Sequence, residues 1–272
     1  MPAEQLRDSA GVLHAPAPDA RIVSLVPSIT ELLFDLGLGA RVVGRTGFCV
    51  HPAPAVRDVP KVGGTKDVKL EALRALRPTH VVVNVDENEA GAVEAMRRFV
   101  PHIVVTHPNA PEDNLALYAL LGALFGAERQ AGELSTALRR ELDLCRRSDD
   151  PRERVLYLIW KDPWMTIAAD TYIARTLACV GWDVTTPPGG WAGAARYPRV
   201  DDVVAAANAV DRVLLSTEPF PFTEAHAQDL RARVVPPVQL IDAEMTSWYG
   251  SRAIPGLACL RGLRRAASAQ GA

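Results

Sequence analysis

The sequence predicts an α/β protein with two Rossmann-like parallel-sheet lobes joined by a long backbone helix. Uniformly apolar strand segments alternate with helical segments over residues 21–106 and again over 154–242, a pattern typical of parallel sheets covered on both faces. Between them, residues 111–147 lack strand signals and are rich in helix formers. The chain has 272 residues, enough for two cores. We therefore expect a first lobe over 1–110, connecting helices over 111–150 and a second lobe over 151–272.

The first β-α-β unit is predicted at the beginning of the first lobe. Residues 21–26 form a short β-branched run, which predicts a strand. Ser28 and Glu31 have the spacing of a capping box, so a helix should follow, and Gly37 should end it. A second strand is predicted over 41–45.

The same pattern recurs along the first lobe and then gives way to helices. The segments "KLEALRALRPTHVVVNV" and "AVEAMRRFVPHIVVTH" each predict a helix followed by a buried strand. In 111–147 a break at Phe125 and Gly126 should leave two helices. The second of these, with about 20 residues, would be about 30 Å long.

The second lobe repeats the alternation. Strands are predicted over 154–160, 211–217 and 238–242, and helices over 171–180, 200–208 and 223–233, followed by a final helix.

Composition excludes several classes of protein. The net charge is −2, so no overall field attracts nucleic acid or an anionic membrane. The four cysteines are scattered without a C-x-x-C pair, which argues against a zinc ribbon and a disulfide framework. No apolar run reaches the ~20 residues needed to span a membrane, and the first residues do not resemble a secretory leader. A cytoplasmic location is expected for the sequence as written, and a periplasmic one if translation starts upstream.

Aromatic and charged side chains follow the predicted strands, where ligands bind in open α/β sheets. Trp160 and Trp164 should form walls for a large flat ligand, with Lys161 orienting it; packing between domains is the alternative. The candidate residues of a ligand-binding cleft are Phe48, Cys49, His51, Asp86, Glu87, Trp160, Lys161, Trp164, Asp170, Tyr172, Trp191, Tyr197, Glu218, Phe220, Trp248 and Arg252.

Two other kinds of site are compatible with the sequence. Cys49 and His51 are a C-x-H pair that could ligate zinc, copper or iron directly, and His107 is a further candidate ligand. Glu218 and His226, or Asp170, could act as acid and base, although no nucleophile motif such as G-x-S-x-G accompanies them. No catalytic residue and no intrinsic cofactor is predicted.

The segments "RIVSLVPSITELLFDLG" and "KVGGTKDVKLEALRALRPTHVVV", with the long helix and second lobe, resemble the class III periplasmic-type substrate-binding proteins of the helical-backbone metal receptor group. The resemblance covers residues 7–265. It implies two rigid lobes joined by one helix and a metal chelate held between them. The chelate would be cobalamin or another corrinoid, haem, or a ferric siderophore.

The resemblance also implies a partner, the permease of an ABC importer, which docks on one surface carboxylate of each lobe. Glu71 matches the position in the first lobe. The matching position in the second lobe falls near Val203, with Asp201 and Asp202 beside it. The leading hypothesis is non-enzymatic chelate binding, and the alternatives are a cytoplasmic metal-handling protein and an enzyme acting on a chelate or cofactor.

Overall fold

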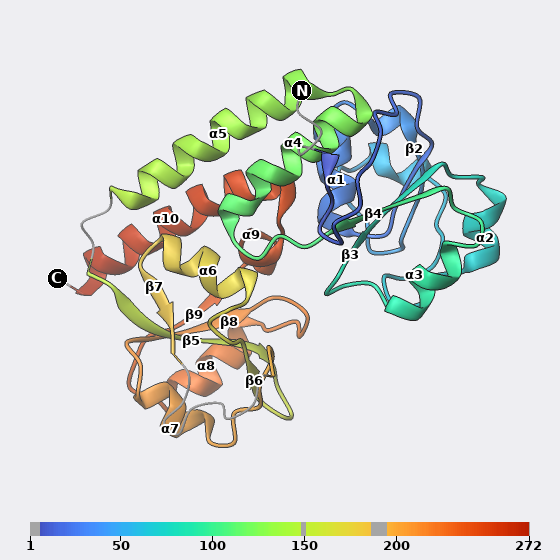
Figure 1. The fold of residues 1–272 in the computed structure, drawn as a ribbon. Coiled ribbons are helices and arrows are strands. Elements are labelled where there is room, and N and C mark those ends of the chain that lie inside the picture. The colour runs from blue at the N-terminus through green and yellow to red at the C-terminus, as the bar shows by residue number, and fades with distance from the viewer. Residues whose placement is uncertain (1–5, 148–150, 186–194, 272) are drawn as a thin grey trace. The chain divides into compact units, whose positions relative to one another are not determined.

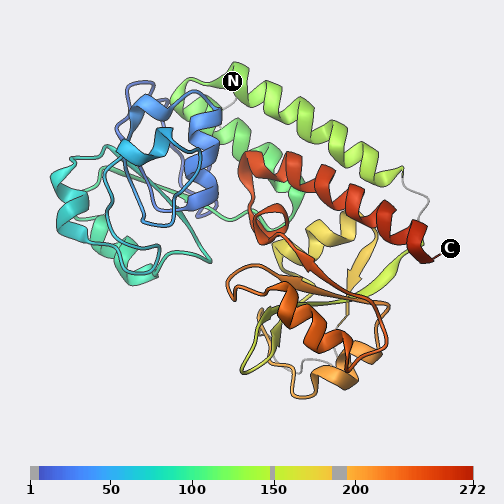
Figure 2. The same cartoon turned by 180° about the vertical axis from the view of Figure 1, so that it is seen from behind.

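The computed structural model describes residues 6–147, 151–185 and 195–271 of the chain (Figures 1 and 2). The chain divides into two compact units. The first unit comprises Met1–Pro108, Glu112–Leu138 and Tyr249–Arg252, and the second comprises Asn109–Pro111, Arg139–Trp248 and Ala253–Ala272. The chain first passes between the units around residues 108–112, next to the predicted division at 110. It passes again inside helix α5 (Glu128–Arg146), between Leu138 and Arg139, where the sequence placed the division at 150.

The first unit is built on a four-stranded parallel sheet. The strands are β1 (Ile22–Ser24), β2 (Val42–Arg45), β3 (His80–Asn84) and β4 (His102–Thr106). Their order across the sheet is β2-β1-β3-β4. All four strands were predicted, and the structure confirms them with slightly shorter ends.

Both faces of this sheet are covered by helices (Figure 1). Val23, Val81 and Ile103 point to one face and share a core with Leu73 and Met96. Those last two residues belong to helices α2 (Leu70–Ala75) and α3 (Ala90–Met96). Helices α1 (Pro27–Asp35) and α4 (Asn114–Phe125) complete the unit. Burial on both faces explains why these strands read as continuous apolar runs.

The predicted capping box of helix α1 is wrong. The helix begins at Pro27 with Val26 as its N-cap, no side chain caps it, and Ser28 is buried inside its first turn. Proline is pre-organised for the first helical position and has no amide N–H to satisfy, so a capping side chain is not required. The predicted end of the helix is correct, because Gly37 has a φ of +76° just beyond it.

The second unit contains a five-stranded sheet. Its strands are β5 (Glu153–Trp160), β6 (Met165–Thr166), β7 (Trp182–Val184), β8 (Arg212–Ser216) and β9 (Val238–Ile241). The order is β6-β5-β8-β9, with β7 also paired to β5. Only β6 is antiparallel. The sequence did not predict β6 and β7, since two or three residues are too few to show a strand period.

Helices also cover both faces of the second sheet. They are α6 (Tyr172–Cys179), α7 (Val203–Asn208), α8 (Glu224–Arg231), α9 (Ala243–Ser247) and α10 (Ala253–Gly271). Leu156 and Val213 pack with residues of α7 and α8 on one face. On the other face the Tyr157 hydroxyl lies 2.9 Å from Ser216 Oγ and 2.7 Å from Thr246 Oγ1. Burial raises the pKa of Tyr157 to about 12, so this network stays neutral.

Four short 3₁₀ helices complete the described elements: η2 (Gly39–Arg41), η3 (Ala55–Asp58), η4 (Pro111–Asp113) and η5 (Gly250–Arg252). Among the described residues, no helix combines the length and the apolar character needed to cross a bilayer.

A buried histidine lies at the start of β3 in the first unit. The His80 ring stacks on His102 at 4.7 Å between centroids and meets Phe125 edge-on at 5.4 Å. Burial, and then the nearby His102 and His14, lower the pKa of His80 from 6.5 to about 4. The folded protein therefore keeps His80 neutral where the unfolded chain would protonate it.

This shift predicts that acid destabilises the first unit. Because the folded pKa is the lower one, the unfolded chain binds more protons between pH 6.5 and 4, and stability falls as the pH drops through that window. The loss should be roughly 2 to 3 kcal/mol at the acid end. Urea unfolding midpoints of wild type and His80→Gln, measured from pH 7.5 to 4.5, check this. Equal pH slopes for the two proteins would contradict it.

Candidate functional site

Four aromatic side chains gather at the carboxyl ends of the strands in the second unit. The Trp160 and Phe220 rings meet edge-on at 5.7 Å, and the Trp164 and Phe222 rings stack at 5.9 Å. Phe220 and Phe222 join the two pairs at 4.7 Å. We call these four residues the aromatic cluster. Trp160 is 39% exposed, so the cluster presents an indole to solvent.

Backbone hydrogen bonds fix where the cluster forms. The Phe220 N–H donates to the Ile159 carbonyl at 3.3 Å, which holds the loop after β8 against the end of β5. The chain then reverses after Trp160, with Asp162 at a φ of +61°, and β6 pairs back onto β5. Aspartate tolerates this left-handed conformation better than most residues. Two loops distant in sequence thus bring their rings together.

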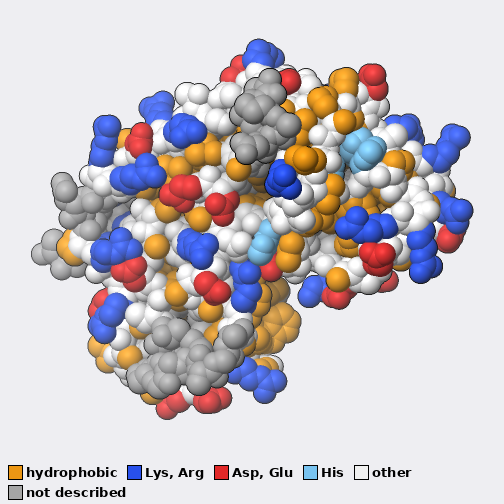
Figure 3. Space-filling view, in the orientation of Figure 1, with side chains coloured by type: hydrophobic (Ala, Val, Ile, Leu, Met, Phe, Trp, Pro, Cys, Tyr) orange, Lys and Arg blue, Asp and Glu red, His pale blue; other side chains and the backbone are white. Residues whose placement is uncertain are grey.

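Two more predicted residues lie beside this turn. The Lys161 ammonium lies 5.9 Å from the centroid of the Trp164 ring, within range of a cation–π interaction. Tyr197 is exposed in a segment that runs along β6, where Thr166 N–H donates to the Pro198 carbonyl at 3.0 Å. In Figure 3, hydrophobic side chains are gathered on the surface at this end of the second unit.

The other predicted residues of the second unit have varied positions. Asp170 and Glu218 are exposed, Trp248 is half-buried after helix α9, and Tyr172 is buried at the start of helix α6. Trp191 lies outside the described residues. The role of each of these side chains in a ligand site stays a prediction.

His226 has a structural role that the sequence analysis missed. Its Nδ1 lies 3.0 Å from the Thr223 backbone nitrogen and 2.9 Å from Thr223 Oγ1, so it closes a capping box on helix α8. The ring also packs edge-on against Phe220 and Phe222 at 5.4 and 5.7 Å. The threonine three residues before the histidine was the available signal. This arrangement gives the predicted acid–base pair of Glu218 and His226 no geometric support.

In the first unit, the loop after β3 carries two of the predicted carboxylates. Asp86 Oδ2 lies 3.4 Å from His107 Nε2. Glu87 Oε1 accepts a hydrogen bond of 2.5 Å from the Tyr249 hydroxyl. Burial raises the pKa of Glu87, and Tyr249 partly offsets that by hydrogen bonding to the carboxylate.

Asn88, which was not among the predicted site residues, holds this loop in place. Its Oδ1 accepts from the Asn84 N–H at 2.9 Å, and its Nδ2 donates to the carbonyls of Leu25 and Thr65 at 3.2 and 2.8 Å. One amide therefore connects the segments that follow β1 and β3 with the loop before helix α2. Phe48, on the loop after β2, is 63% exposed and offers an aromatic surface there.

The structure gives direct metal ligation by Cys49 and His51 no support. The Cys49 thiol is buried, lies 3.1 Å from both Thr30 Oγ1 and Thr46 Oγ1, and has its pKa raised by burial. Metals bind the thiolate, which this environment disfavours. Among the described residues, no group of three or more His, Cys, Asp or Glu side chains could hold a metal ion. Ligation by Cys49 and His51 stays a prediction.

Two further predicted residues belong to the first unit: Arg252, predicted for the ligand cleft, and Glu71, predicted for docking on a partner. The Arg252 guanidinium binds both carboxylate oxygens of Glu31, at 2.8 and 2.5 Å, and is half-buried. This bidentate pair fixes the 3₁₀ helix η5 against helix α1. Glu71 lies exposed in the first turn of helix α2, as docking on a partner would require.

Solved structures of known proteins share this fold. The periplasmic vitamin B12-binding protein of Vibrio cholerae has a TM-score of 0.76 at 16% identity, covering 93% of this chain and 99% of that one. The periplasmic heme-binding protein of Roseiflexus sp. RS-1 has a TM-score of 0.73 at 22% identity, covering 92% and 99%. At these identities the likeness concerns the fold, and it confirms the predicted two-lobed α/β class.

Curated sequences give a closer comparison over part of the chain. The vitamin B12-binding protein of Vibrio campbellii is 25% identical over 190 residues, which are 68% of this chain and 66% of that protein. An uncharacterized ABC transporter substrate-binding lipoprotein of Bacillus subtilis is 30% identical over 166 residues, 58% and 52% of the two chains. The matched part thus spans about two thirds and about half of these relatives' lengths.

A family model described as periplasmic binding protein matches residues 22–213, which include the first sheet, helix α5 and the first strands of the second sheet. The resemblance read from the two sequence segments is therefore confirmed. The chain belongs to the periplasmic binding protein family.

Proposed function

We propose that this chain binds a metal chelate, which is a corrinoid, haem or a ferric siderophore, and releases it unchanged. The aromatic cluster beyond strands β5 and β8 is the observation that carries this proposal. It supplies an exposed indole on a rigid base, and relatives of the chain are named for vitamin B12 and heme. The cluster is the principal binding surface in this account.

The chemistry of the cluster suits a flat macrocycle. An indole face has a large apolar area and loses little conformational freedom on binding, so it binds planar rings well. Trp160 rests edge-on against Phe220, which limits its movement. Lys161 supplies a positive charge next to Trp164, where it can orient an amide or carboxylate at the edge of a ligand.

Binding is favoured over catalysis by what the polar side chains do. His226 caps a helix and the Cys49 thiol is buried between two threonine hydroxyls. In an enzyme, a neighbouring group tunes the pKa of the general base or the nucleophile to its task. Neither arrangement resembles such a pair. The carboxylates that follow β3 are likewise engaged with His107 and Tyr249.

The proposal is tested by titrating the purified protein with cyanocobalamin, hemin and a ferric catecholate siderophore while following tryptophan fluorescence. At least one should quench the fluorescence saturably, and mass spectrometry should recover that ligand unchanged. Absence of saturable binding by all three would refute the proposal. Recovery of a modified ligand would favour an enzyme instead. A bound metal ion that is lost in Cys49→Ser would favour direct metal handling.

Replacing the exposed indole should weaken binding while the fold persists. Trp160→Ala should cost roughly 1 to 3 kcal/mol of binding free energy, as for other aromatic contact residues. Trp160→Phe should retain most of the affinity, because a ring can still stack. Calorimetric titration with the ligand identified above measures both. Val235→Ala is the control, because this side chain is exposed and belongs to the loop between α8 and β9. Equal affinity for wild type and Trp160→Ala would contradict the stacking role.

We further propose that the chain delivers its ligand to the permease of an ABC importer and docks through Glu71. The exposed position of this carboxylate on helix α2 supports the proposal, as does the relative named as an ABC transporter substrate-binding lipoprotein. An exposed carboxylate can pair with a basic side chain of a partner and steer its approach.

Reversing this charge should impair transport without impairing ligand binding. Glu71→Arg should lower ligand uptake several-fold in cells that carry the matching permease, since an exposed ion pair contributes up to about 1 kcal/mol and reversal adds repulsion. Glu94→Arg is the matched control, because Glu94 is also an exposed helical glutamate of the first unit. If both variants transport alike, Glu71 is not the docking residue.

A further inference from the structure

The second unit contains a cavity far from the aromatic cluster along the strands. It has a volume of about 650 Å³ and lies between the loop 234–238 and helix α10. Arg212 and Val238, which line it, are the first residues of β8 and β9. The aromatic cluster follows the opposite, carboxyl ends of β5 and β8. The cavity is therefore separate from the proposed chelate site.

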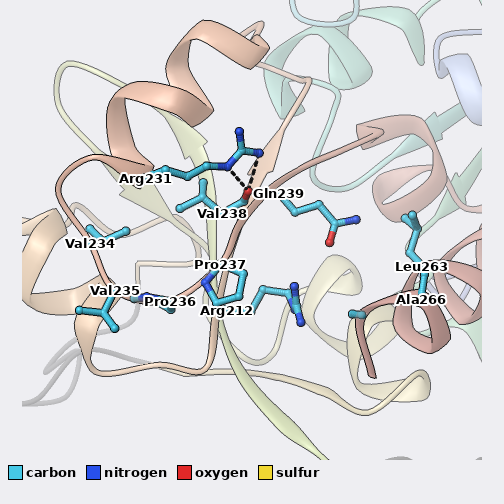
Figure 4. Close-up of a pocket in the computed structure, with 11 residues that line it drawn as sticks. Arg212, Arg231, Val234, Val235, Pro236, Pro237, Val238, Gln239, Leu263 and Ala266 are labelled. Carbon is cyan, nitrogen blue, oxygen red and sulfur yellow. Dashed lines mark hydrogen bonds between the residues drawn. The ribbon is translucent and has the colours of Figure 1, made fainter. Parts of the chain in front are cut away.

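Two polar side chains extend into this cavity from neighbouring strands. Gln239 pairs in register with Leu214, so it shares a face of the sheet with Arg212, two residues before Leu214. In Figure 4 the Arg212 guanidinium and the Gln239 carboxamide both extend toward Leu263 and Ala266 of helix α10. A guanidinium and an amide side by side provide several N–H donors for one anionic group.

The buried charges beside the cavity do not balance. Glu153 accepts from Arg212 Nε at 3.0 Å through one carboxylate oxygen, and Arg264 Nη1 lies 3.2 Å from the other. The Arg212 and Arg264 side chains are only 9% and 3% exposed. Among the described residues this group thus has two buried positive charges and one negative charge. Burial of an excess charge is unfavourable unless a counter-ion accompanies it.

Several other arginines of the second unit pair with a carboxylate, whereas Arg175 and Arg196 donate to Asn109. Arg152 pairs with Asp183, Arg154 with Asp211, Arg231 with Glu224 and Arg261 with Glu141. Arg231 also lines the cavity, but its Nε and Nη2 donate to the Val238 carbonyl. Arg212 differs, since within the described part of the chain its Nη1 and Nη2 have no hydrogen-bond partner. Those two groups are the donors available to a ligand.

The walls of the cavity define the rest of the ligand. Pro236, Pro237, Leu263 and Ala266 line it, and all are apolar. An excess of one positive charge matches a monoanion better than a phosphate dianion. The volume exceeds what an anionic head group alone would fill, so an apolar body should accompany it.

From these observations we infer that the cavity between loop 234–238 and helix α10 is a second ligand site, which binds a small organic carboxylate. Arg212 and Gln239 hold the carboxylate, and the proline and α10 walls contact the apolar body. Binding completes the charge balance of the Arg212, Glu153 and Arg264 group and should stabilise the second unit.

Benzoate is a suitable probe, with neutral benzamide and inorganic phosphate as comparisons. Calorimetric titration of the full chain should detect saturable benzoate binding and none of benzamide, and benzoate should raise the melting temperature. Arg212→Met should weaken benzoate binding at least tenfold, because the charge-assisted hydrogen bonds are lost. That change leaves Glu153 with Arg264 and the Trp182 indole N–H as partners, so the fold should persist. Gln239→Leu should have a smaller effect.

A second pair of variants tests the charge balance without altering Arg212. Ala266→Glu places a carboxylate at the cavity and should raise the melting temperature above that of Ala266→Gln, while abolishing benzoate binding. Trp160→Ala should bind benzoate like wild type, which separates this site from the chelate site. The inference is overturned if benzoate does not bind, if benzamide binds equally, if phosphate binds in place of benzoate, or if the two Ala266 variants behave alike.

Discussion

The covering of both sheets on both faces by helices is the constraint from which the rest of the structure follows. Strand interiors such as Val81–Val83 and Leu156–Leu158 are buried, so they have no surface for a ligand. Polar and aromatic side chains for a ligand therefore lie at the ends of the strands or just after them, as Trp160 at the end of β5 and Asp86 after β3 illustrate. Helix N-termini and connecting loops converge at the carboxyl ends, which makes that edge of each sheet the natural binding surface.

Hydrogen bonds order these loops, so that they form a defined binding surface. In the first unit Asn88 connects the segments after β1 and β3 with the loop before α2, and Tyr249 fixes Glu87. In the second unit the Phe220 N–H is bound to the end of β5, so Trp160 rests on an ordered ring. A surface that is already ordered loses less conformational entropy when a ligand binds. This organisation therefore favours the binding of a ligand at these loops.

The sequence was sufficient for the features that depend on long periodic patterns, and insufficient for those that depend on one local contact. The strands of the first sheet and β5, β8 and β9 were predictable because burial on both faces leaves an apolar run. Strands β6 and β7 were too short to show a period, and the start of helix α1 was decided by Pro27 rather than by Ser28.

Among site residues, Trp160, Trp164 and Phe220 were predicted, and the structure places them in one cluster. The capping role of His226 and the burial of Cys49 depend on tertiary contacts with side chains that a single sequence does not locate.

The most direct test of the central claim is the set of tryptophan indole N–H resonances in an NMR spectrum, recorded with and without cyanocobalamin or hemin. The Trp160 resonance should shift or broaden on binding. The Trp182 indole, buried with its N–H donated to Glu153 at 3.0 Å, should keep its position. If a ligand binds tightly and the Trp160 resonance does not move, the aromatic cluster is not the binding surface and the account is wrong.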